Sequence, residues 1–400
     1  MKRAIVSVIN DLNTDQRVHR TCMVLRELGF KVILVGRRQR ISKAMEERPY
    51  KTKRMILLFE KGFLFYAFFN IRLFFFLFFH KADVLFANDL DTLWPNHLIS
   101  KIKGSKLVYD THELFCEVPE LQGSDRKRKF WKRIEKRIFP KLKFVFTVNQ
   151  SIADIYSKEY KVDVKVVRNI PGSVIPVKKD ANEEHYHHVH PDQNQVKQFQ
   201  EDQKLIIRIQ KESRGIPMDK KIIILQGAGI NMDRGAEEAV EAMKYVNGAM
   251  LLIVGGGDVL PVLKRSVKEN KLEEKVRFID KLPYHEMVGY TRLADIGLTL
   301  DKDTNINYRY SLPNKIFDYI HANIAVLASP LIEVKRIVDE FKVGEVISSH
   351  DPKHIAEKLN AMLSDEIKLK EWKQNAKLAA GKLNWENEKQ ELIRVFKTFL

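Results

Sequence analysis

Short apolar runs alternate with helix-length segments through the first 170 residues of the chain. Most runs are continuously apolar and rich in β-branched and aromatic residues, which is typical of strands buried on both faces of a parallel sheet. The spacing leaves room for a crossover helix between most pairs, so the pattern predicts a doubly wound α/β domain. The expected strands are residues 4–9, 31–36, 83–89, 106–112, 144–149 and 164–169.

A second α/β series follows and predicts a second Rossmann-like domain. Helical patterns separate its strands, and an amphipathic segment closes the chain. Ligands of such sheets bind beyond the carboxyl ends of the strands, so a deep cleft between two facing domains is the expected site. The expected strands are residues 221–229, 249–258, 276–280, 295–301 and 324–329.

A polar segment, residues 178–204, separates the two series. Its four histidines favour either a metal site or a solvated excursion between domains. These histidines are His185, His187, His188 and His190. The predicted division is a first domain of residues 1–172 with the closing helix 385–400, a linker of residues 173–215, and a second domain of residues 216–384.

The most hydrophobic stretch, residues 62–79, contains nine of the 23 phenylalanines. On an insertion scale its apolar residues outweigh the cost of Arg72, which is about 2.5–3.5 kcal/mol. The expected strands on either side belong to one sheet, however, and a bilayer span would put them on opposite sides of a membrane. The stretch is therefore predicted to be a crossover helix. We expect part of it to meet lipid or a second subunit, which leaves a homodimer open.

The net charge of +17 favours anionic partners: nucleic acid, anionic lipid or phosphorylated small molecules. Residues 125–143 carry ten Lys or Arg and two acids, with an apolar stripe at helical spacing from Trp131 to Leu142. Such a basic amphipathic helix, expected to end near Pro140, is typical of anionic membrane surfaces. The alternative is a charged helix whose stripe packs on its own domain. No aromatic-basic RNA-binding motif accompanies it, so nucleic acid is not an expected partner.

Cysteine usage and the amino terminus bear on the compartment. Cys22 and Cys116 allow at most one disulfide, which favours a reducing environment. The apolar run of the first strand is about five residues long, too short for a signal-peptide core. These features predict a cytoplasmic protein.

The segment 225–243 combines a strand end, a glycine-containing loop and a helix start. Gly227 and Gly229 let backbone N–H groups approach a ligand closely, and Arg234 and Gly235 precede the helix. A helix start beside an arginine favours an anion. The dinucleotide fingerprint fails because Met232 replaces its third glycine, and no Walker A motif is present. The segment predicts diphosphate binding, or a turn that serves only the change from strand to helix.

The segment 307–329 places a cation and a carboxylate on one helix. Pro313 suits the first helical turn, and Lys315 and Asp318 then share one side. Lys315 would bind phosphate and Asp318 sugar hydroxyls, although the pair could equally be a surface salt bridge. Backbone amides at the helix start come from Ser311, Leu312 and Asn314.

These motifs, in this order, resemble the family 4 (group 1) retaining glycosyltransferases of GT-B fold. The resemblance rests on "LLIVGGGD", "LPYHEMVGYTRLADIGLTLD" and "SLPNKIFDYIHANIAVLAS" in the second half and on "NDLNTDQRVHRTCMVLRELGFKVILVGRR", "YDTHE" and "VVRNIP" in the first. It covers nearly the whole chain. It implies two facing Rossmann-like domains with a last helix that returns to the first domain. It also implies transfer of a sugar from a nucleotide diphospho-sugar with retention, with no essential metal or other cofactor.

The resemblance also assigns donor residues. Arg234 falls at the family's phosphate-binding lysine and Asp318 at an acidic ribose contact, while Lys315 is one turn away from the latter. Two departures stand out, because Tyr310 replaces an acidic residue and Ala228 an arginine. They shift the expected donor contacts onto Lys315, Arg309 and backbone amides.

In the first domain the resemblance places His112 near the acceptor and the transferred sugar, with Glu113 beside it. The loop after the first strand is expected to reach the acceptor, and Asn88 and Asp89 end a comparable strand. The D-x-D triplets 89–91 and 301–303 are interpreted as chance. The acceptor-loop residues are Asn10, Asp11, Asp15 and Arg17.

The sequence thus predicts a glycosyltransferase that acts on a glycan or lipid-linked acceptor. It is expected at the inner face of a membrane, held there by residues 125–143 and in part by residues 62–79. Two alternatives stay open: a nucleotide-sugar epimerase of the same fold, and a noncatalytic basic module that binds membranes or nucleic acid.

Overall fold

The computed structural model describes every residue except 14, 41, 43, 46, 173–204 and 207, and divides into two compact α/β units. The four histidines between residues 185 and 190 therefore lie outside the described residues. Unit 1 is Met1–Ile170 with Asp303–Leu312 and Trp385–Leu400, and unit 2 is Pro171–Lys302 with Pro313–Asn384. The predicted second domain is thus interrupted, because residues 303–312 group with unit 1.

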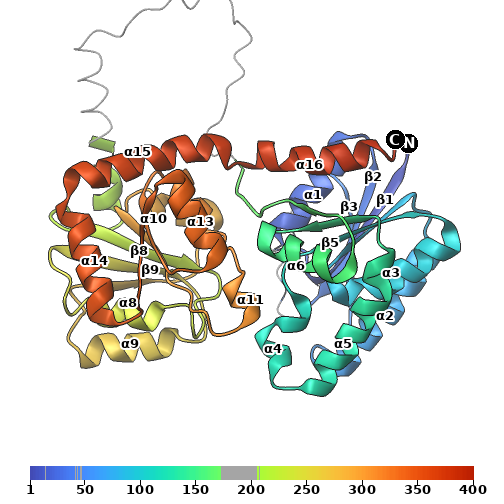
Figure 1. Ribbon diagram of the computed structural model, residues 1–400, viewed down its shortest axis with the longest axis horizontal. Helices are drawn as coiled ribbons and strands as arrows, with labels where there is room; N and C mark the ends of the chain where they lie inside the picture. The colour runs from blue at the N-terminus through green and yellow to red at the C-terminus, as the bar shows by residue number, and fades with distance from the viewer. Residues whose placement is uncertain (14, 41, 43, 46, 173–204, 207) are drawn as a thin grey trace, which may run out of the picture. The chain divides into compact units, whose positions relative to one another are not determined.

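Unit 1 contains a seven-stranded parallel sheet in the order β3-β2-β1-β4-β5-β6-β7 (Figure 1). Its strands are β1 (Arg3–Asp11), β2 (Lys31–Arg38), β3 (Lys51–Ile56), β4 (Val84–Asn88), β5 (Lys106–Thr111), β6 (Phe144–Thr147) and β7 (Val164–Val166). Its helices are α1 (Gln16–Glu27), α2 (Gly62–Phe79), α3 (Leu90–Lys103), η1 (Phe115–Glu117), α4 (Pro119–Gln122), α5 (Asp125–Ile138), η2 (Phe139–Lys141), α6 (Gln150–Tyr160), α11 (Ile306–Arg309) and α16 (Trp385–Lys397).

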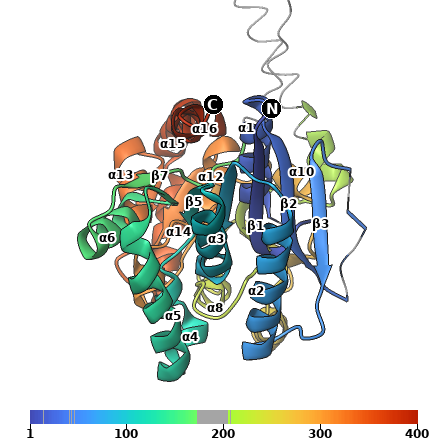
Figure 2. The same cartoon turned by 90° about the vertical axis from the view of Figure 1, so that its right-hand side faces the viewer.

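Helices cover this sheet on both faces, which explains the continuously apolar strands. In β1, Ala4 and Val6 belong to the core that α1 and α16 cover. Ile5 and Ile9 belong to the core under α2. Figure 1 shows α1 with α16 on one side of the sheet and α2 with α3 on the other, and Figure 2 agrees. The closing helix therefore returns to the first unit, as predicted.

The phenylalanine-rich helix α2 connects β3 to β4 within this one sheet, which confirms the predicted crossover. By length and composition alone α2 could also cross a membrane. A stripe at intervals of four residues, Phe65, Phe69, Leu73 and Leu77, is buried on the sheet. The opposite face, including Phe75 and Phe79, is exposed.

The basic helix α5 ends before Pro140, as predicted, but its apolar stripe is not available to lipid. Trp131 and Ile138 are buried in the core of unit 1, and Ile134 packs against it. Buried Glu135 accepts hydrogen bonds from Lys132 at 2.6 Å and from Tyr160 at 2.5 Å. The alternative prediction for this helix is therefore confirmed, because the apolar stripe of α5 packs on its own unit and the basic residues face outward.

Unit 2 contains a six-stranded parallel sheet in the order β10-β9-β8-β11-β12-β13. Its strands are β8 (Lys221–Gly227), β9 (Ala249–Gly255), β10 (Val276–Ile279), β11 (Ile296–Thr299), β12 (Ala325–Ala328) and β13 (Gly344–Val346). Its helices are α8 (Ala236–Ala242), α9 (Leu260–Glu269), α10 (Tyr284–Thr291), α12 (Lys315–His321), α13 (Ile332–Phe341), α14 (Pro352–Ser364) and α15 (Glu366–Lys382).

Each sheet reverses its winding direction once, between β1 and β4 in unit 1 and between β8 and β11 in unit 2. In doubly wound sheets, ligands bind beyond the carboxyl ends of the strands at this switch point. Ligands are therefore expected at the end of β1 beside β4 and at the end of β8 beside β11.

Both cysteines, Cys22 and Cys116, are buried free thiols.

Candidate functional site

At the unit 1 switch point, Asp89 follows β4 with a φ of 59°, an unfavourable conformation for a residue with a side chain. Its carboxylate accepts a hydrogen bond from the His112 backbone N–H at 2.9 Å and lies 3.1 Å from His112 Nδ1. The strained residue is thus held in place by the residue that follows β5. This arrangement fixes the imidazole at the predicted acceptor position.

His112 lies between two carboxylates. Its Nε2 is 3.5 Å from Asp110, in addition to the contact with Asp89. Burial alone would lower the pKa of His112, but Asp89 and Asp110 outweigh it and raise the pKa well above its ordinary value. A ring that stays protonated at neutral pH donates hydrogen bonds and stabilises negative charge. It is not suited to act as a general base.

Arg17 does not lie in the acceptor loop, contrary to the prediction. It lies in the first turn of α1, buried, and forms a two-pronged ion pair with Asp110 at 2.7 and 2.9 Å. Its third hydrogen bond goes to the Val167 carbonyl at 2.5 Å. Burial would raise the pKa of Asp110, but Arg17 and His112 hold it well below its usual range. Arg17 therefore holds α1, β5 and the chain after β7 together.

The other predicted loop residues have different surroundings. Asp15 caps α1 by accepting a hydrogen bond from Val18 N at 3.0 Å. Asp11 pairs with Arg54 at 3.1 Å and accepts a hydrogen bond from Ser42. Asn10 lines a pocket, whereas Asp11 and Asp15 stabilise the loop that carries it.

Glu113 is held by the segment that interrupts unit 2 in the sequence. Asn307 Nδ2 donates to Glu113 Oε2 at 2.9 Å, and Asn307 Oδ1 accepts from the Leu114 backbone N–H at 3.1 Å. Burial raises the pKa of Glu113, with a further contribution from nearby Asp89. These bonds explain why residues 303–312 belong to unit 1.

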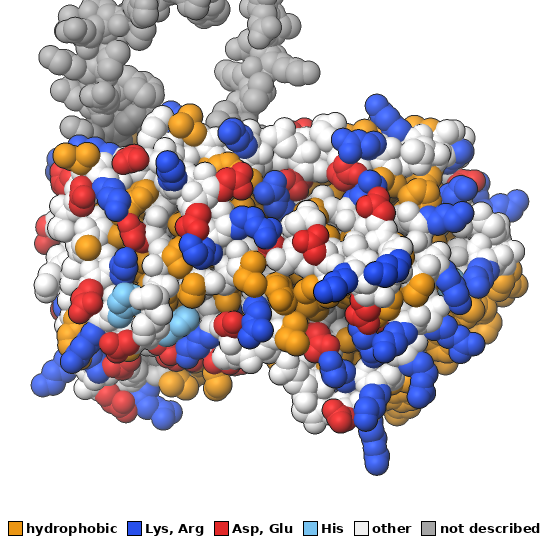
Figure 3. Space-filling model, viewed as in Figure 1, with side chains coloured by type: hydrophobic (Ala, Val, Ile, Leu, Met, Phe, Trp, Pro, Cys, Tyr) orange, Lys and Arg blue, Asp and Glu red, His pale blue; other side chains and the backbone are white. Residues whose placement is uncertain are grey.

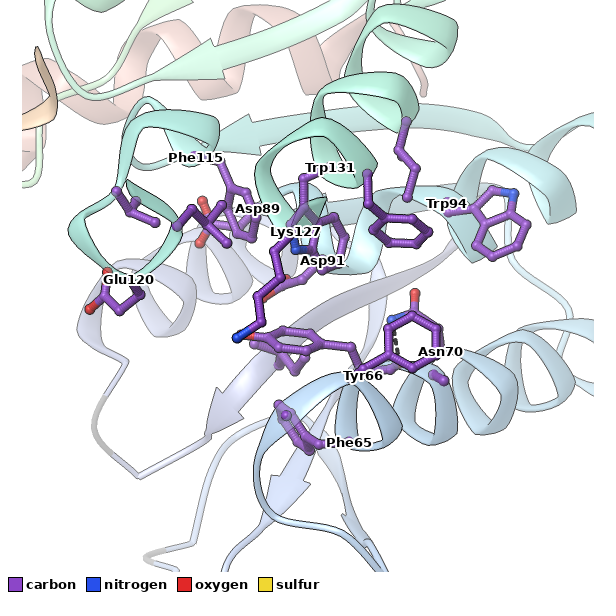
Figure 4. A pocket seen from close by; sticks show the side chains of 18 of the residues that line it. Phe65, Tyr66, Asn70, Asp89, Asp91, Trp94, Phe115, Glu120, Lys127 and Trp131 are labelled. Atoms are coloured by element: carbon purple, nitrogen blue, oxygen red, sulfur yellow. Dashed lines mark hydrogen bonds between the residues drawn. The ribbon is translucent and has the colours of Figure 1, made fainter. Parts of the chain in front are cut away.

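A cavity of about 810 Å³ opens beside these residues, between α2 and α5. Asn10, Asp89 and Glu113 line it together with apolar and aromatic side chains (Figure 4). Two predicted acceptor-side residues, Asn10 and Asp89, thus meet the catalytic candidate Glu113 in one pocket at the switch point of unit 1. Asp91, which the sequence analysis did not single out, also lines it.

In unit 2, Asp301 holds both predicted phosphate-binding cations just beyond β11. Arg234 donates to Asp301 Oδ1 at 2.8 Å, and Lys315 Nζ lies 2.9 Å from Oδ2. Burial would raise the pKa of Asp301, but Lys315 and Arg234 lower it below its ordinary value. One carboxylate and two cations leave a net positive charge at the carboxyl edge of this sheet.

The predicted glycines differ in whether the fold itself requires a residue without a side chain. Gly235 has a φ of 73°, and a Cβ there would lie 2.2 Å from the Leu300 carbonyl oxygen, so packing requires glycine. Added Cβ atoms on Gly227 and Gly229 would come no closer than 3.7 and 3.6 Å to their neighbours. Internal packing therefore does not explain these two glycines, and close approach of a ligand to the loop would.

Asp318 lies on α12 at the same edge of the sheet. It accepts hydrogen bonds from Gln226 Nε2 at 3.0 Å and from the Tyr284 hydroxyl at 2.9 Å. Gln226 is itself buried and accepts from Thr291 Oγ1 at 2.6 Å. This network orients the Asp318 carboxylate.

The remaining predicted donor residues divide between the units. Asn314 lies at the N-cap position of α12 in unit 2, without a side-chain capping hydrogen bond. Arg309, Ser311 and Leu312 group with unit 1. Arg309 pairs with Asp303 at 3.0 Å on the surface, and Ser311 donates to the Tyr308 carbonyl at 2.9 Å.

The two D-x-D triplets were interpreted as chance matches to a metal-binding motif, and the first aspartate of each makes other contacts in the structure. Asp89 holds His112, and Asp301 holds Arg234 and Lys315. Their location at strand ends was the signal that could have identified them. Among the residues that the structure describes, no group of three or more His, Cys, Asp or Glu side chains could hold a metal ion.

Family models match both halves of the chain. Residues 15–174 match the model described as Glycosyltransferase Family 4, and residues 206–379 match Glycosyl transferases group 1. The chain belongs to the family 4, group 1 glycosyltransferases. In this glycosyltransferase the first match lies in unit 1, and the second contains Arg234, Lys315 and Asp318.

Individual relatives are distant. D-inositol 3-phosphate glycosyltransferase of Xylanimonas cellulosilytica is 22% identical over 192 residues, which cover 46% of this chain and 44% of that relative. The glycosyltransferase thus spans less than half the length of that curated relative.

Solved structures show the GT-B fold. Sucrose-phosphate synthase from Thermosynechococcus elongatus matches with a TM-score of 0.74 at 15% identity, covering 100% of this chain and 99% of that one. WaaG, a glycosyltransferase involved in lipopolysaccharide biosynthesis, matches with 0.65 at 14% identity and 99% coverage of both chains. HepE of Anabaena, solved in complex with UDP-glucose, matches with 0.68 at 11% identity and 100% coverage of both.

Proposed function

We propose that the protein transfers a sugar from a nucleotide diphospho-sugar, with retention of anomeric configuration and without a required metal, to a glycan or lipid-linked acceptor. The observation that carries this proposal is the pairing of Arg234 and Lys315 on buried Asp301. Two cations fixed at the carboxyl edge of a doubly wound sheet form a site that fits a diphosphate. That HepE was solved with UDP-glucose supports a nucleotide sugar as the donor.

The roles of the donor residues follow from their surroundings. Arg234 and Lys315 bind the diphosphate, and the exposed loop at Gly227 and Gly229 lets backbone N–H groups approach it. Asp318 accepts hydrogen bonds from the ribose hydroxyls. One of these takes the place of the hydrogen bond that the exposed Tyr284 hydroxyl donates to Asp318.

The chemistry requires little covalent work by the protein. Positive charge at Arg234 and Lys315 stabilises the negative charge that develops on the departing diphosphate. The acceptor hydroxyl attacks on the face that the diphosphate leaves, so configuration is retained. Protonated His112 donates a hydrogen bond to the transferred sugar.

We further propose that the protein binds the inner face of a membrane. The exposed face of α2 carries Phe63, Phe75 and Phe79, and the outward side of α5 is basic. Figure 3 shows apolar side chains gathered at the edge of unit 1 where Figure 1 draws α2, with Lys and Arg nearby. An apolar patch beside basic residues fits an anionic lipid surface.

The decisive test of the donor site is a thermal-shift panel of UDP, GDP, ADP and dTDP on the unaltered protein. One of them should raise the melting temperature, because a ligand that binds only the native state stabilises it. Arg234→Ala and Lys315→Ala should each weaken that nucleotide about tenfold or more, the loss of one charge-assisted hydrogen bond. Arg265→Ala, an exposed cation on α9, is the matched control. Unchanged affinity in both site variants would exclude the assigned donor site.

Product analysis with a labelled donor then tests the reaction. Label that moves to an acceptor with its anomeric configuration kept supports retaining transfer, also in the presence of EDTA. Label that stays on the nucleotide with an altered sugar would instead show epimerisation.

A further inference from the structure

The cavity between α2 and α5 lies at the switch point of unit 1. Its lining has three chemically different parts: an aromatic wall, a floor with a carboxyl group, and a basic rim. One wall is aromatic. The Phe63 ring lies 6.0 Å from that of Phe130, and Tyr66 lies 5.3 Å from Trp131, both edge to face. These pairs bridge α2 and α5 along the cavity, and Phe63 and Phe130 are also exposed. Such a surface fits an apolar chain.

The floor of the cavity contains a carboxyl group without a partner. Asp91 is 5% exposed, and its Oδ1 has no hydrogen-bond partner among the described residues. Figure 4 shows Asp91 between Trp131 and Tyr66, from the start of α3. A buried acceptor atom that lacks a donor is costly, and a ligand hydroxyl would satisfy it.

Asp91 does not have an evident structural purpose. It lies in the first turn of α3, but no side-chain hydrogen bond caps that helix. Burial, together with nearby Asp89, raises the pKa of Asp91 well above its ordinary value. A carboxyl group that folding destabilises in this way is kept for a reason other than stability.

The rim of the cavity is basic. Arg126 and Lys127, in the first turn of α5, line it and are exposed, and Figure 4 shows Lys127 extending into the cavity. Arg37, at the end of β2, lines it as well, with its guanidinium 4.7 Å from the Phe65 ring centroid. Exposed cations at the mouth of an apolar cavity fit a phosphate.

We propose that this cavity binds the acceptor, and that the acceptor is an amphipathic phosphate-linked sugar. Its apolar chain lies on the aromatic wall, its phosphate faces Arg126 and Lys127, and a sugar hydroxyl donates to Asp91 Oδ1. This inference rests on the proposed transferase function and narrows it, because a purely polar glycan would leave the aromatic wall unused. Asp91 is then a substrate-binding residue.

Two simple amphiphiles separate the parts of this proposal. n-Decyl β-D-glucoside offers a chain and sugar hydroxyls, and n-decyl phosphate a chain and an anion. Both are titrated below their critical micelle concentrations. Tryptophan fluorescence reports binding, because two of the four tryptophans, Trp94 and Trp131, line the cavity.

Asp91→Asn should weaken decyl glucoside about tenfold, because the amide nitrogen that replaces one carboxyl oxygen cannot accept a hydrogen bond, and should leave decyl phosphate no weaker. Lys127→Ala combined with Arg126→Ala should weaken decyl phosphate by a similar factor and leave decyl glucoside unchanged. The melting temperature of Asp91→Asn should stay the same or rise. Asp154→Asn, an exposed acid on α6, is the control and should change neither affinity.

The opposite results would overturn the proposal. These are an Asp91→Asn protein that binds decyl glucoside as well as the unaltered chain, or one that loses stability and both ligands together. Failure of both amphiphiles to bind the unaltered protein would do the same. Nucleotide binding at Arg234 and Lys315 is measured separately, so failure of the acceptor site is distinguishable from failure of the donor site.

Discussion

Each unit has a buried aspartate at the carboxyl edge of its sheet that pairs with one or two cations. The two pairings serve different purposes. In unit 1, Asp110 pairs with Arg17, whose side chain is 5% exposed. In unit 2, Asp301 pairs with Arg234 and Lys315, whose side chains are 29% and 13% exposed. The same carboxylate–cation pairing therefore fastens the fold in unit 1 and presents positive charge to solvent in unit 2.

The charge left at each site differs accordingly. In unit 1, the carboxyl groups of Asp89, Asp91 and Glu113 line the cavity, and the cations that also line it belong to its basic rim. In unit 2, the Asp301 carboxylate is outnumbered by its two cations, while Asp318 at the same edge is bound by the neutral side chains of Gln226 and Tyr284. Under the proposed function, the carboxyl-lined site of unit 1 would bind the hydroxyl groups of the acceptor and the cation pair of unit 2 the diphosphate of the donor, so two similar sheets would carry sites of different chemistry.

The largest effect is expected from breaking the buried pair of unit 1. Arg17→Ala leaves Asp110 buried without its arginine and should lower the free energy of unfolding by about 3–5 kcal/mol. Urea unfolding measures this loss. Lys335→Ala, which removes an exposed ion pair with Asp339 on α13, should change stability by less than about 0.5 kcal/mol. Equal effects of the two changes would refute the structural role of Arg17.

Asp301→Asn should have a smaller effect, because its two cations stay partly solvated. We expect a loss of about 1–3 kcal/mol at pH 7, together with weaker nucleotide binding as the cations lose their anchor. The pKa of Asp301 is lowered in the folded state, so its contribution is present above the unfolded pKa of about 3.9. It disappears as the pH falls below that value.

Urea titrations of the unaltered and Asp301→Asn proteins at pH 7, 5 and 3.5 check this. The stability difference should narrow at the lowest pH. A difference that is constant with pH would show that the ion pairs do not cause it.

His112→Gln should cost about 1–2 kcal/mol, since glutamine can keep one hydrogen bond but not the charge. The pKa of His112 is raised in the folded state, so its contribution is complete below the unfolded pKa of about 6.5 and is lost as the pH rises through the folded pKa. Unfolding measured between pH 6 and 10 should show the gap between the variant and the unaltered protein narrowing progressively as the pH rises above about 6.5. A larger gap at pH 10 than at pH 6 would contradict a protonated ring.

The smallest effect on stability is expected on the exposed face of α2. Phe75→Ser with Phe78→Ser should change the free energy of unfolding by about 0.5 kcal/mol or less each, because these rings are 53% and 43% exposed. The same pair should abolish sedimentation with vesicles of anionic lipid. Ile367→Ser, at an even more exposed apolar residue on α15, is the control and should bind vesicles normally. Undiminished vesicle binding by the α2 variant would exclude this face as a membrane contact.

Much of the fold was predictable because buried parallel strands are apolar on both faces. Eleven expected strands correspond to β1, β2, β4 to β7 and β8 to β12. Two edge strands, β3 and β13, were missed. The sequence of β3, "KTKRMI", has three cations and only one buried residue, Met55, because an edge strand pairs on one side only.

The candidate site was predictable only in part. Arg234, Lys315 and Asp318 were identified from motif spacing, whereas Asp301, which joins the first two, lies 67 residues from Arg234. Arg17 was assigned to a loop because its segment directly follows the first strand. It is buried instead, because Asp110, 93 residues away, neutralises it. Long-range pairing of this kind leaves no local signal.

The sequence alone determined which segments form strands and that α2 is a crossover helix, since apolar periodicity and chain order decide both. Tertiary structure decided which charged residues are available to a ligand. Arg17 and Arg234 are both arginines near helix starts that follow a first strand. The position of an aspartate at the end of a distant strand decides that Arg17 is buried and structural, whereas Arg234 stays partly exposed to solvent. The physical reason is that the cost of burying a charge depends on its partner in space.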